Sequence, residues 1–531
     1  MKSTFRLLIF SWFLLPITTC PAETYDLIIR HGRVVDGTGN PAYFGDIGVT
    51  NGRIAAIGRL TGDAKREINA TNLVVAPGFI DVHTHADEVA EMPLAENFVR
   101  MGVTTIVVGN CGGSASDIGK FFREVEATNV SVNVASFIGH NTVRGKVMGG
   151  SFMRPPTPEE LEKMKAMVEQ AMKDGAIGLS TGLIYLPGTF AKTEEIIELA
   201  KVASTYDGIY ASHMRDEGTG IFNSLNELFR IAREAHIRAE ISHIKLSGNS
   251  SWGQTDKVIA VIEKARAEGL DITEDQYAYT ASSTGISQLV PDTAREGGHA
   301  KFLERINDPK QKSGIIAKMK ASLKENGRQD YTYAVVAEYK HDTSLNGLNI
   351  SEAAKAKLGS DSLPDQIELI LDIERHGGAS GVFHGIDEVD LQKFLRFPNT
   401  AIACDSGLRE FGKGVPHPRG YGNNPRVLAR YVRELHVLSL EDAIRRMTTL
   451  PAESFRLKER GQLREGNWAD ITIFDPASVR DNATYKDPHH YPSGIPYVLV
   501  NGVEVVRDGE HTQARSGQAL RHLPVTAESI P

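Results

Sequence analysis

The sequence has 531 residues, which is enough for a large catalytic domain and a smaller one. Hydrophobic residues make up 41% and charged residues 24%, the ordinary composition of a soluble globular protein. The net charge of -8 excludes the broad basic surface that binds nucleic acid, so we expect no nucleic-acid partner.

Residues 1–22 differ in character from the rest of the chain. Lys2 and Arg6 precede an apolar run, and small residues follow it up to Ala22. This pattern predicts a secretory signal peptide and therefore an exported, periplasmic or secreted protein. The apolar run is too short to span a bilayer comfortably, and no later segment looks transmembrane. A lipid anchor at Cys20 is the alternative, although the residues before it make a poor lipid-attachment sequence.

The pattern of the chain changes at Pro77. Residues 23–76 contain short apolar runs separated by Gly, Asn and Asp turns, which predict the first part of a small β domain. Residues 77–455 alternate between short apolar strands and amphipathic helices, and this alternation predicts a (β/α)8 TIM-type barrel. The eight expected strands are 79–82, 104–109, 132–139, 177–180, 209–212, 238–242, 271–274 and 401–404.

One region inside the barrel segment lacks this rhythm. Residues 285–375 are largely helical, and a ninth strand-like run follows at 381–384, around Val382. We expect residues 285–347 to be an insertion that forms a lid over the barrel mouth. The ninth strand then belongs to the return path of that insertion.

The short β pattern returns at residues 456–512. Asn501-Gly502 lies between two apolar runs and is a strong signal for a hairpin turn. We expect residues 23–76 and 456–512 to form one small β-sandwich domain, with the barrel inserted between its two parts. Residues 513–531 are expected to be a loose tail.

Ligand-type side chains occur at the ends of several expected strands. His83 and His85 are two residues apart on a strand, so both side chains face the same way and could hold zinc. The other strand ends carry Cys111, His213, His243 and Asp405. Because the strand ends of a barrel converge on one mouth, these six side chains could hold one or two zinc ions.

Each of these residues also has a purely structural explanation. A lone cysteine is commonly a buried small hydrophobe, a strand-end histidine a hydrogen-bonded structural residue, and Asp405 could cap the following turn. The coincidence of all six at strand ends favours the metal. His140 and His384 also lie at strand ends, but no ligand position is left for them, so we expect structural or indirect roles.

Several motifs together resemble a known family. Residues 77–85 resemble the opening strand of the amidohydrolase superfamily. Further segments are similar to its D-aminoacylase (N-acyl-D-amino-acid deacylase) branch: 178–185, Gly109-Asn110-Cys111-Gly112, Ser212-His213-Met214-Arg215, Ser242-His243-Ile244-Lys245 and Asp405-Ser406-Gly407. The resemblance implies a barrel with a small β domain and an inserted segment. It also implies that Cys111 replaces the modified lysine of many relatives.

The resemblance further implies how the site is divided. A tight zinc would bind Cys111, His213 and His243, and a second, weaker site would use His83, His85 and Asp405. A substrate carboxylate would be held by Lys245, Tyr277 and Arg419, although these could also be surface charges and ordinary packing. The loop 408–415, which precedes Arg419, departs from the family pattern.

The expected activity is zinc-dependent hydrolysis of N-acyl-D-amino acids, a small-molecule substrate class. Asp405 would take a proton from the attacking water and return it to the departing amine. The preference for the D form comes only from the resemblance. Two alternatives remain: hydrolysis of a cyclic amide, lactone or small dipeptide on the same scaffold, and a metal-binding protein without turnover. Asp405 argues against the second, because a binding protein needs no proton shuttle.

Overall fold

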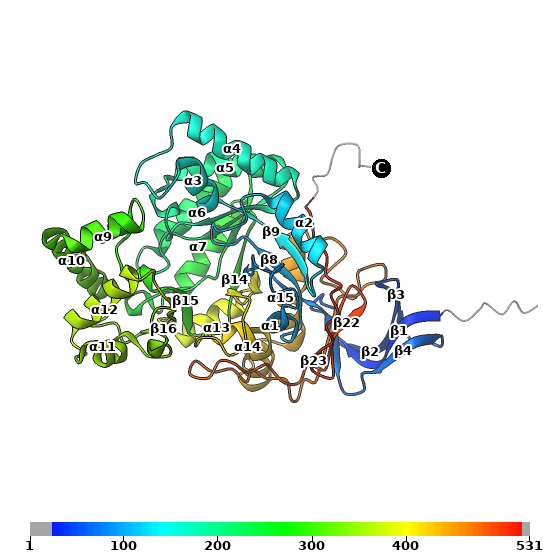
Figure 1. The fold of residues 1–531 in the computed structure, drawn as a ribbon. Helices are drawn as coiled ribbons and strands as arrows, with labels where there is room; N and C mark the ends of the chain where they lie inside the picture. Colours follow the sequence, from blue (N-terminus) through cyan, green and yellow to red (C-terminus); the bar gives the residue numbers. More distant parts are fainter. Residues whose placement is uncertain (1–23, 523–531) are drawn as a thin grey trace, which may run out of the picture.

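The computed structural model describes residues 24–522, and Figure 1 shows their arrangement. The expected signal peptide, Cys20 and residues 523–531 of the expected tail lie outside the described residues. A barrel surrounded by helices forms the centre, a β domain lies on one side of it, and a mostly helical segment lies on the other (Figure 1).

The predicted eight-stranded parallel barrel is confirmed. Its strands are β6 (Phe79–Asp81), β8 (Val103–Val108), β9 (Asn133–Ser136), β11 (Gly178–Gly182), β12 (Ile209–His213), β13 (Arg238–Ile241), β14 (Ile272–Gln276) and β18 (Thr400–Ile402). β10 (Ile138–Gly139) continues the line of β9 and pairs with β11. The ring closes where β19 (Ser406–Gly407) pairs with β7 (Thr84–His85), beside a hydrogen bond from the Asp405 amide to the His83 carbonyl.

Amphipathic helices pack around this ring. They include α2 (Ile118–Thr128), α4 (Pro158–Lys173), α5 (Thr193–Thr205), α6 (Ile221–Ala235), α7 (Thr255–Ala267), α13 (Glu388–Arg396) and α15 (Leu440–Met447). The start of α4 is capped by side chains. The Thr157 hydroxyl accepts the Glu160 amide at 3.2 Å, and the Glu160 carboxylate accepts the Thr157 amide at 2.7 Å. This reciprocal cap satisfies backbone donors that the first helical turn leaves free.

The two outer parts of the chain form one sheet. Its strands are β1 (Thr24–Val34), β2 (Tyr43–Thr50), β3 (Arg53–Gly58), β4 (Asp63–Asn69), β5 (Val74–Pro77), β20 (Ile471–Phe474), β21 (Tyr497–Val500), β22 (Val503–Arg507) and β23 (Glu510–His511). β5 and β20 pair antiparallel and join the two parts. β21 and β22 form the predicted hairpin, with positive φ at both Asn501 and Gly502, as a two-residue turn of this kind requires.

The inserted segment is longer than the expected 285–347. It begins with β15 (Ala281–Gly285), contains β16 (Ala334–Glu338) and returns through β17 (Ser380–His384), and these strands form a separate antiparallel sheet in the order β15-β17-β16. The ninth strand is therefore β17. The longer helices of the inserted segment are α9 (His299–Asn307), α10 (Pro309–Glu325), α11 (Ile350–Leu358) and α12 (Leu363–Arg375). The last two are amphipathic like barrel helices, so their pattern gave no sign that they pack in a separate core.

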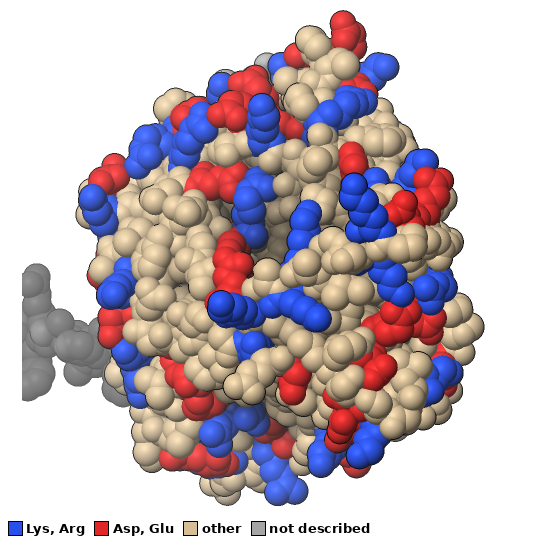
Figure 2. Space-filling model, turned by 90° about the vertical axis from the view of Figure 1, so that its left-hand side faces the viewer, with Lys and Arg blue, Asp and Glu red and all other residues tan. Residues whose placement is uncertain are grey.

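Figure 2 shows the side of the molecule that carries this inserted segment. The surface there has a hollow, and both basic and acidic side chains border it. No helix within residues 24–522 is long and apolar enough to cross a membrane.

The prediction of a loose tail is wrong for residues 513–522. This polar segment lies along the barrel, where the Val134 amide donates to Gln518 and the Leu520 amide donates back to Val134. The His522 amide donates to Gly175. Backbone hydrogen bonds do not depend on side-chain hydrophobicity, so composition alone could not reveal this packing.

Candidate active site

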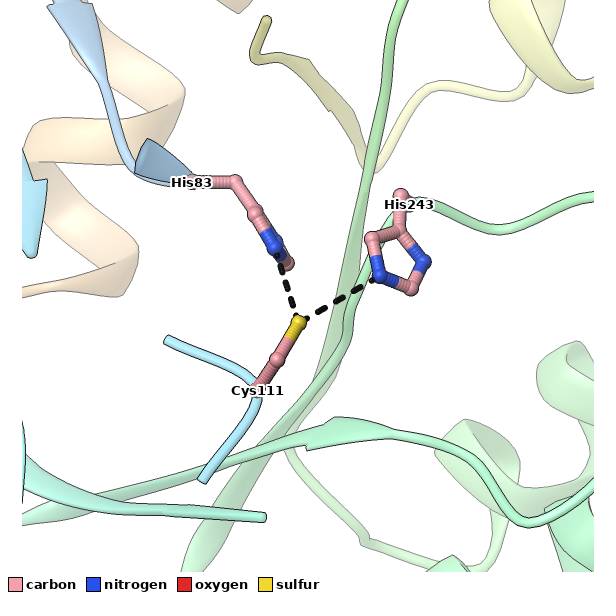
Figure 3. Close-up of side chains that lie close together, drawn as sticks. All are labelled: His83, Cys111 and His243. Atoms are coloured by element: carbon pink, nitrogen blue, oxygen red, sulfur yellow. Dashed lines mark hydrogen bonds between the residues drawn. The ribbon is translucent and has the colours of Figure 1, made fainter. Parts of the chain in front are cut away.

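The six expected metal ligands converge at the carboxyl ends of the barrel strands. Cys111 lies at the centre of three imidazoles. Its Sγ is 3.3 Å from His83 Nε2 and 3.5 Å from His243 Nε2, as Figure 3 shows, and 3.8 Å from His213 Nδ1. The donor atoms of His83, Cys111 and His243 all lie within 4.8 Å of one another, close enough to share one ion.

Asp405 joins the same cluster from the segment between β18 and β19. Its Oδ1 is 3.1 Å from His85 Nε2 and 3.7 Å from His83 Nε2. Its Oδ2 is 2.9 Å from Arg419 Nη1. His83 therefore faces both Cys111 and Asp405, so the two expected metal sites adjoin each other.

Three of these residues have an unusual backbone. Cys111, His243 and Asp405 have φ values of 52°, 38° and 52°, in the left-handed region that non-glycine residues rarely occupy. Such a conformation costs about 1–3 kcal/mol and persists only where the surrounding structure enforces it. Its occurrence at three residues of one cluster indicates that the fold gives up stability to direct these side chains into the mouth.

The charge state of the cluster suits a soft divalent metal. Burial opposes ionisation of Cys111, but His83, His213 and His243 outweigh it and hold the pKa of the thiol well below its usual range. A thiolate with neighbouring imidazoles is the donor set that zinc prefers. In addition, His213 Nε2 is buried and has no hydrogen-bond partner within residues 24–522. The residues present therefore fit zinc.

Arg419 and Tyr277 form the second part of the site. The Arg419 guanidinium carbon lies 4.5 Å from the centre of the Tyr277 ring. Both side chains are buried. Tyr277 Oη and Arg419 Nε have no hydrogen-bond partner among the described residues. Buried donors of this kind are costly unless a ligand meets them.

The position of Arg419 depends on the inserted segment. The Arg419 amide donates to His417 Nδ1 at 3.0 Å, and His417 Nε2 donates to the Ala281 carbonyl at 2.9 Å. Arg419 Nη2 donates to the Ser283 carbonyl at 3.3 Å. Ala281 and Ser283 both belong to β15, the first strand of the insertion.

Lys245 is engaged by a carboxylate that the sequence did not indicate. Its Nζ donates to Glu217 Oε1 at 2.7 Å and to His243 Nδ1 at 2.9 Å. The second oxygen of this carboxylate, Glu217 Oε2, lies 3.6 Å from His213 Nε2. Burial would raise the pKa of Glu217, but Lys245 and the two histidines hold that pKa well below its usual range. Glu217 is in a loop after β12, and no strand or helix periodicity predicts where it points.

A family model described as the amidohydrolase family matches residues 66–368 and 412–506. The chain belongs to the amidohydrolase family. Among curated relatives, a D-aminoacylase of Alcaligenes xylosoxydans xylosoxydans is 35% identical over 94% of this chain and 98% of its own length. An N-acyl-D-glutamate deacylase of the same organism is 32% identical over 94% of this chain and 97% of its own length.

Solved structures give the same grouping. A crystal structure of a D-aminoacylase has a TM-score of 0.80 and 34% identity, covering 94% of this chain and 100% of its own. The N-acyl-D-glutamate deacylase of Bordetella bronchiseptica, in complex with zinc and a phosphonate inhibitor, has a TM-score of 0.81 and 32% identity with the same coverage. A hydantoinase from Thermus at 15% identity and a TM-score of 0.54 shares the fold alone.

In this amidohydrolase, the carboxylate of Asp275 holds two of the ligand-type histidines. His83 Nδ1 donates to Asp275 Oδ2 at 3.1 Å, and the His243 amide donates to Asp275 Oδ1 at 3.0 Å. A carboxylate behind a metal-ligating histidine fixes the ring and increases its basicity. Asp275 closes a barrel strand as the expected ligands do, so its strand-end position was a usable signal that sequence reasoning missed.

The remaining strand-end histidines lie elsewhere in the amidohydrolase. His140 Nε2 donates to Glu195 at 2.9 Å, where the helix that begins at His140 meets α5. His384 is in β17, and its ring packs 4.8 Å from that of Tyr485. A cavity of about 360 Å³ begins at His213 and Asp405 and continues between the barrel mouth and the inserted segment. It is large enough for a small-molecule substrate.

Proposed function

We propose that this amidohydrolase hydrolyses N-acyl-D-amino acids with zinc, giving a carboxylic acid and a free D-amino acid. The observation that carries the proposal is the pair of unpartnered buried donors, Tyr277 Oη and Arg419 Nε, beside Asp405. A substrate carboxylate would satisfy both, and the planar arginine fork suits it. The relatives are a D-aminoacylase and an N-acyl-D-glutamate deacylase, and they support an N-acyl-D-amino acid as the substrate that carries this carboxylate.

Zinc would be held by the residues of the two expected sites. Cys111, His213 and His243 would form the tight site, and His83, His85 and Asp405 the weaker one. When bound, zinc polarises the scissile carbonyl and acidifies the attacking water. A D-aminoacylase of known structure has a binuclear metal centre, and this supports the proposal that two ions can bind here.

Asp405 would move the proton. Burial disfavours its charge, yet Arg419 and the neighbouring histidines hold the pKa of Asp405 well below its usual range, so it is ionised and can accept a proton. It would take that proton from water as the water attacks the amide carbon. It would then give it to the amide nitrogen as the C–N bond breaks.

The alternative substrates fit this site less well. A cyclic amide or a lactone need not carry a free carboxylate for Tyr277 and Arg419. A metal-binding protein without turnover gives no reason to place an ionised Asp405 between the histidines and Arg419. A small dipeptide keeps the carboxylate and belongs in the substrate panel.

The carboxylate donors are tested with paired substrates. Arg419→Lys and Tyr277→Phe should lower kcat/KM for an N-acetyl-D-amino acid by about 10- to 100-fold, because each removes a hydrogen bond to a charged group. The same variants should affect the corresponding N-acetyl-D-amino acid amide much less. Equal losses on acid and amide would show that these residues do not bind the carboxylate.

The stereochemical part needs a separate comparison. The N-acetyl D- and L-forms of one apolar and one acidic amino acid should be compared at matched concentrations, and we expect clear preference for the D-forms. Preference for the L-forms would overturn this part alone and leave zinc-dependent amide hydrolysis intact.

We also propose that the enzyme is exported. The support is the basic start, apolar run and small-residue end of residues 1–22. Terminal sequencing of the active native protein should therefore give an N-terminus near Glu23. An active protein that retains Met1 would contradict the proposal.

A further inference from the structure

The cavity contains one cation that no carboxylate of residues 24–522 neutralises. Three basic side chains line it: Arg215, Lys245 and Arg328. Arg215 pairs with Glu227 at 2.9 Å, and Lys245 pairs with Glu217 at 2.7 Å. Arg328 has no carboxylate of residues 24–522 within ion-pair distance.

The structure nevertheless holds Arg328 in a defined position. Its Nη2 donates to the His384 carbonyl at 2.9 Å, and its guanidinium carbon lies 3.6 Å from the centre of the Tyr333 ring. Gly385 provides the space, since a Cβ there would lie 2.7 Å from Nη2. Arg328 is half-buried, and this partial burial lowers the pKa of its guanidinium. A partly desolvated, preorganised cation is favourable where an anion meets it.

Arg328 is part of the same cavity as the reacting groups. The cavity extends from His213 and Asp405, at the barrel mouth, to the inserted segment. Beside Arg328 the wall is formed by Tyr333 and Phe383, which can pack against methylene groups. A substrate whose amide lies at Asp405 and whose chain fills the cavity would therefore place its far end near Arg328.

None of the acidic residues that line the cavity forms an ion pair with Arg328. Asp216 accepts the Gly218 amide at 2.6 Å, and Glu325 is an exposed residue at the end of α10. Neither pairs with Arg328. They leave the guanidinium available to an incoming anion.

We infer that Arg328 binds a second carboxylate of the substrate. This inference rests on the proposed function. It limits the expected substrates to N-acyl-D-amino acids that carry two carboxylates. The second carboxylate could belong to an acidic side chain or to a dicarboxylic acyl group, and both offer the same chemistry to the guanidinium.

Isosteric pairs of substrates separate these two sources. N-acetyl-D-glutamate is compared with N-acetyl-D-glutamine, and N-succinyl-D-leucine with N-succinamyl-D-leucine. Each pair differs only in one carboxylate against one carboxamide. For at least one pair, the wild-type enzyme should favour the carboxylate in kcat/KM. Arg328→Gln should lower that preference by about 10- to 100-fold, because a charge-assisted bidentate contact is lost.

Lys324→Gln is the matched control. It also removes one positive charge close to the cavity, but Lys324 is exposed on α10 and does not line the cavity. It should leave both preferences unchanged. If wild type shows no preference for either carboxylate, or if Arg328→Gln keeps that preference, the inference is wrong.

A binding measurement separates this outcome from failure of the proposed function. If the wild-type enzyme hydrolyses none of the four compounds, the proposed function fails. Calorimetric titration with N-acetyl-D-glutamate and N-acetyl-D-glutamine, and with the succinyl pair, then tests Arg328 directly. A preference for carboxylate that disappears in Arg328→Gln supports the subsite, and equal binding overturns it.

Discussion

Replacing Asp405 with asparagine is expected to lower kcat by about 100- to 10,000-fold, the range that general acid–base catalysis typically contributes. Asparagine keeps the shape of the side chain but cannot accept a proton at neutral pH. The tight zinc should largely remain, because Cys111, His213 and His243 are unchanged. The measurements are kcat and the zinc content of the same purified preparation.

This substitution also removes the partner of a buried cation. Arg419 Nη1 lies 2.9 Å from Asp405 Oδ2, and both side chains are almost fully buried. Breaking such a pair can cost about 3–5 kcal/mol of folding stability. Thermal unfolding must therefore show that Asp405→Asn is folded at the assay temperature. Near-normal turnover by the folded variant would remove Asp405 from the proton-transfer role.

Replacing Cys111 with alanine is expected to remove zinc and activity together. The Cys111 thiolate faces three imidazoles, so its loss would remove the anionic donor of the proposed tight site. Loss of a group that merely supports a ligand costs about 10- to 100-fold in metal affinity or activity, so loss of the ligand itself should cost at least about 100-fold. Metal analysis after dialysis and kcat/KM are the two readouts.

The second buried cysteine provides the control. Cys404 is also a free buried thiol, next to Asp405, but it is not one of the residues grouped around a shared metal position. Cys404→Ala should keep zinc. Full zinc content and full activity in Cys111→Ala would show that Cys111 is a buried structural cysteine and not a zinc ligand.

The barrel and its strand-end residues could be predicted because they depend on local pattern. Short apolar strands alternate with helices, and the residue that ends a parallel strand must lie at the mouth. His83, Cys111, His213, His243 and Asp405 were found in this way. The hairpin at Asn501-Gly502 was predictable for a similar reason, since few residues accept the left-handed conformation.

Other parts of the site depend on contacts between distant segments. Glu217 reaches Lys245 from an irregular loop, and no periodic pattern marks its direction. The left-handed backbone at Cys111 and Asp405 results from the surrounding packing rather than from the residue type. The extent of the insertion was also hidden, because α11 and α12 bury an apolar face just as barrel helices do.

The attachment of Arg419 to β15 has a mechanical consequence. His417 and the guanidinium are both tied to carbonyls of this strand, and β15 is the first strand of the inserted sheet. A swing of that sheet away from the barrel would therefore pull the arginine with it. Opening of the cavity would then be coupled to release of the carboxylate that Arg419 is proposed to bind, so the amino acid product would lose its anchor in the same movement that opens its exit.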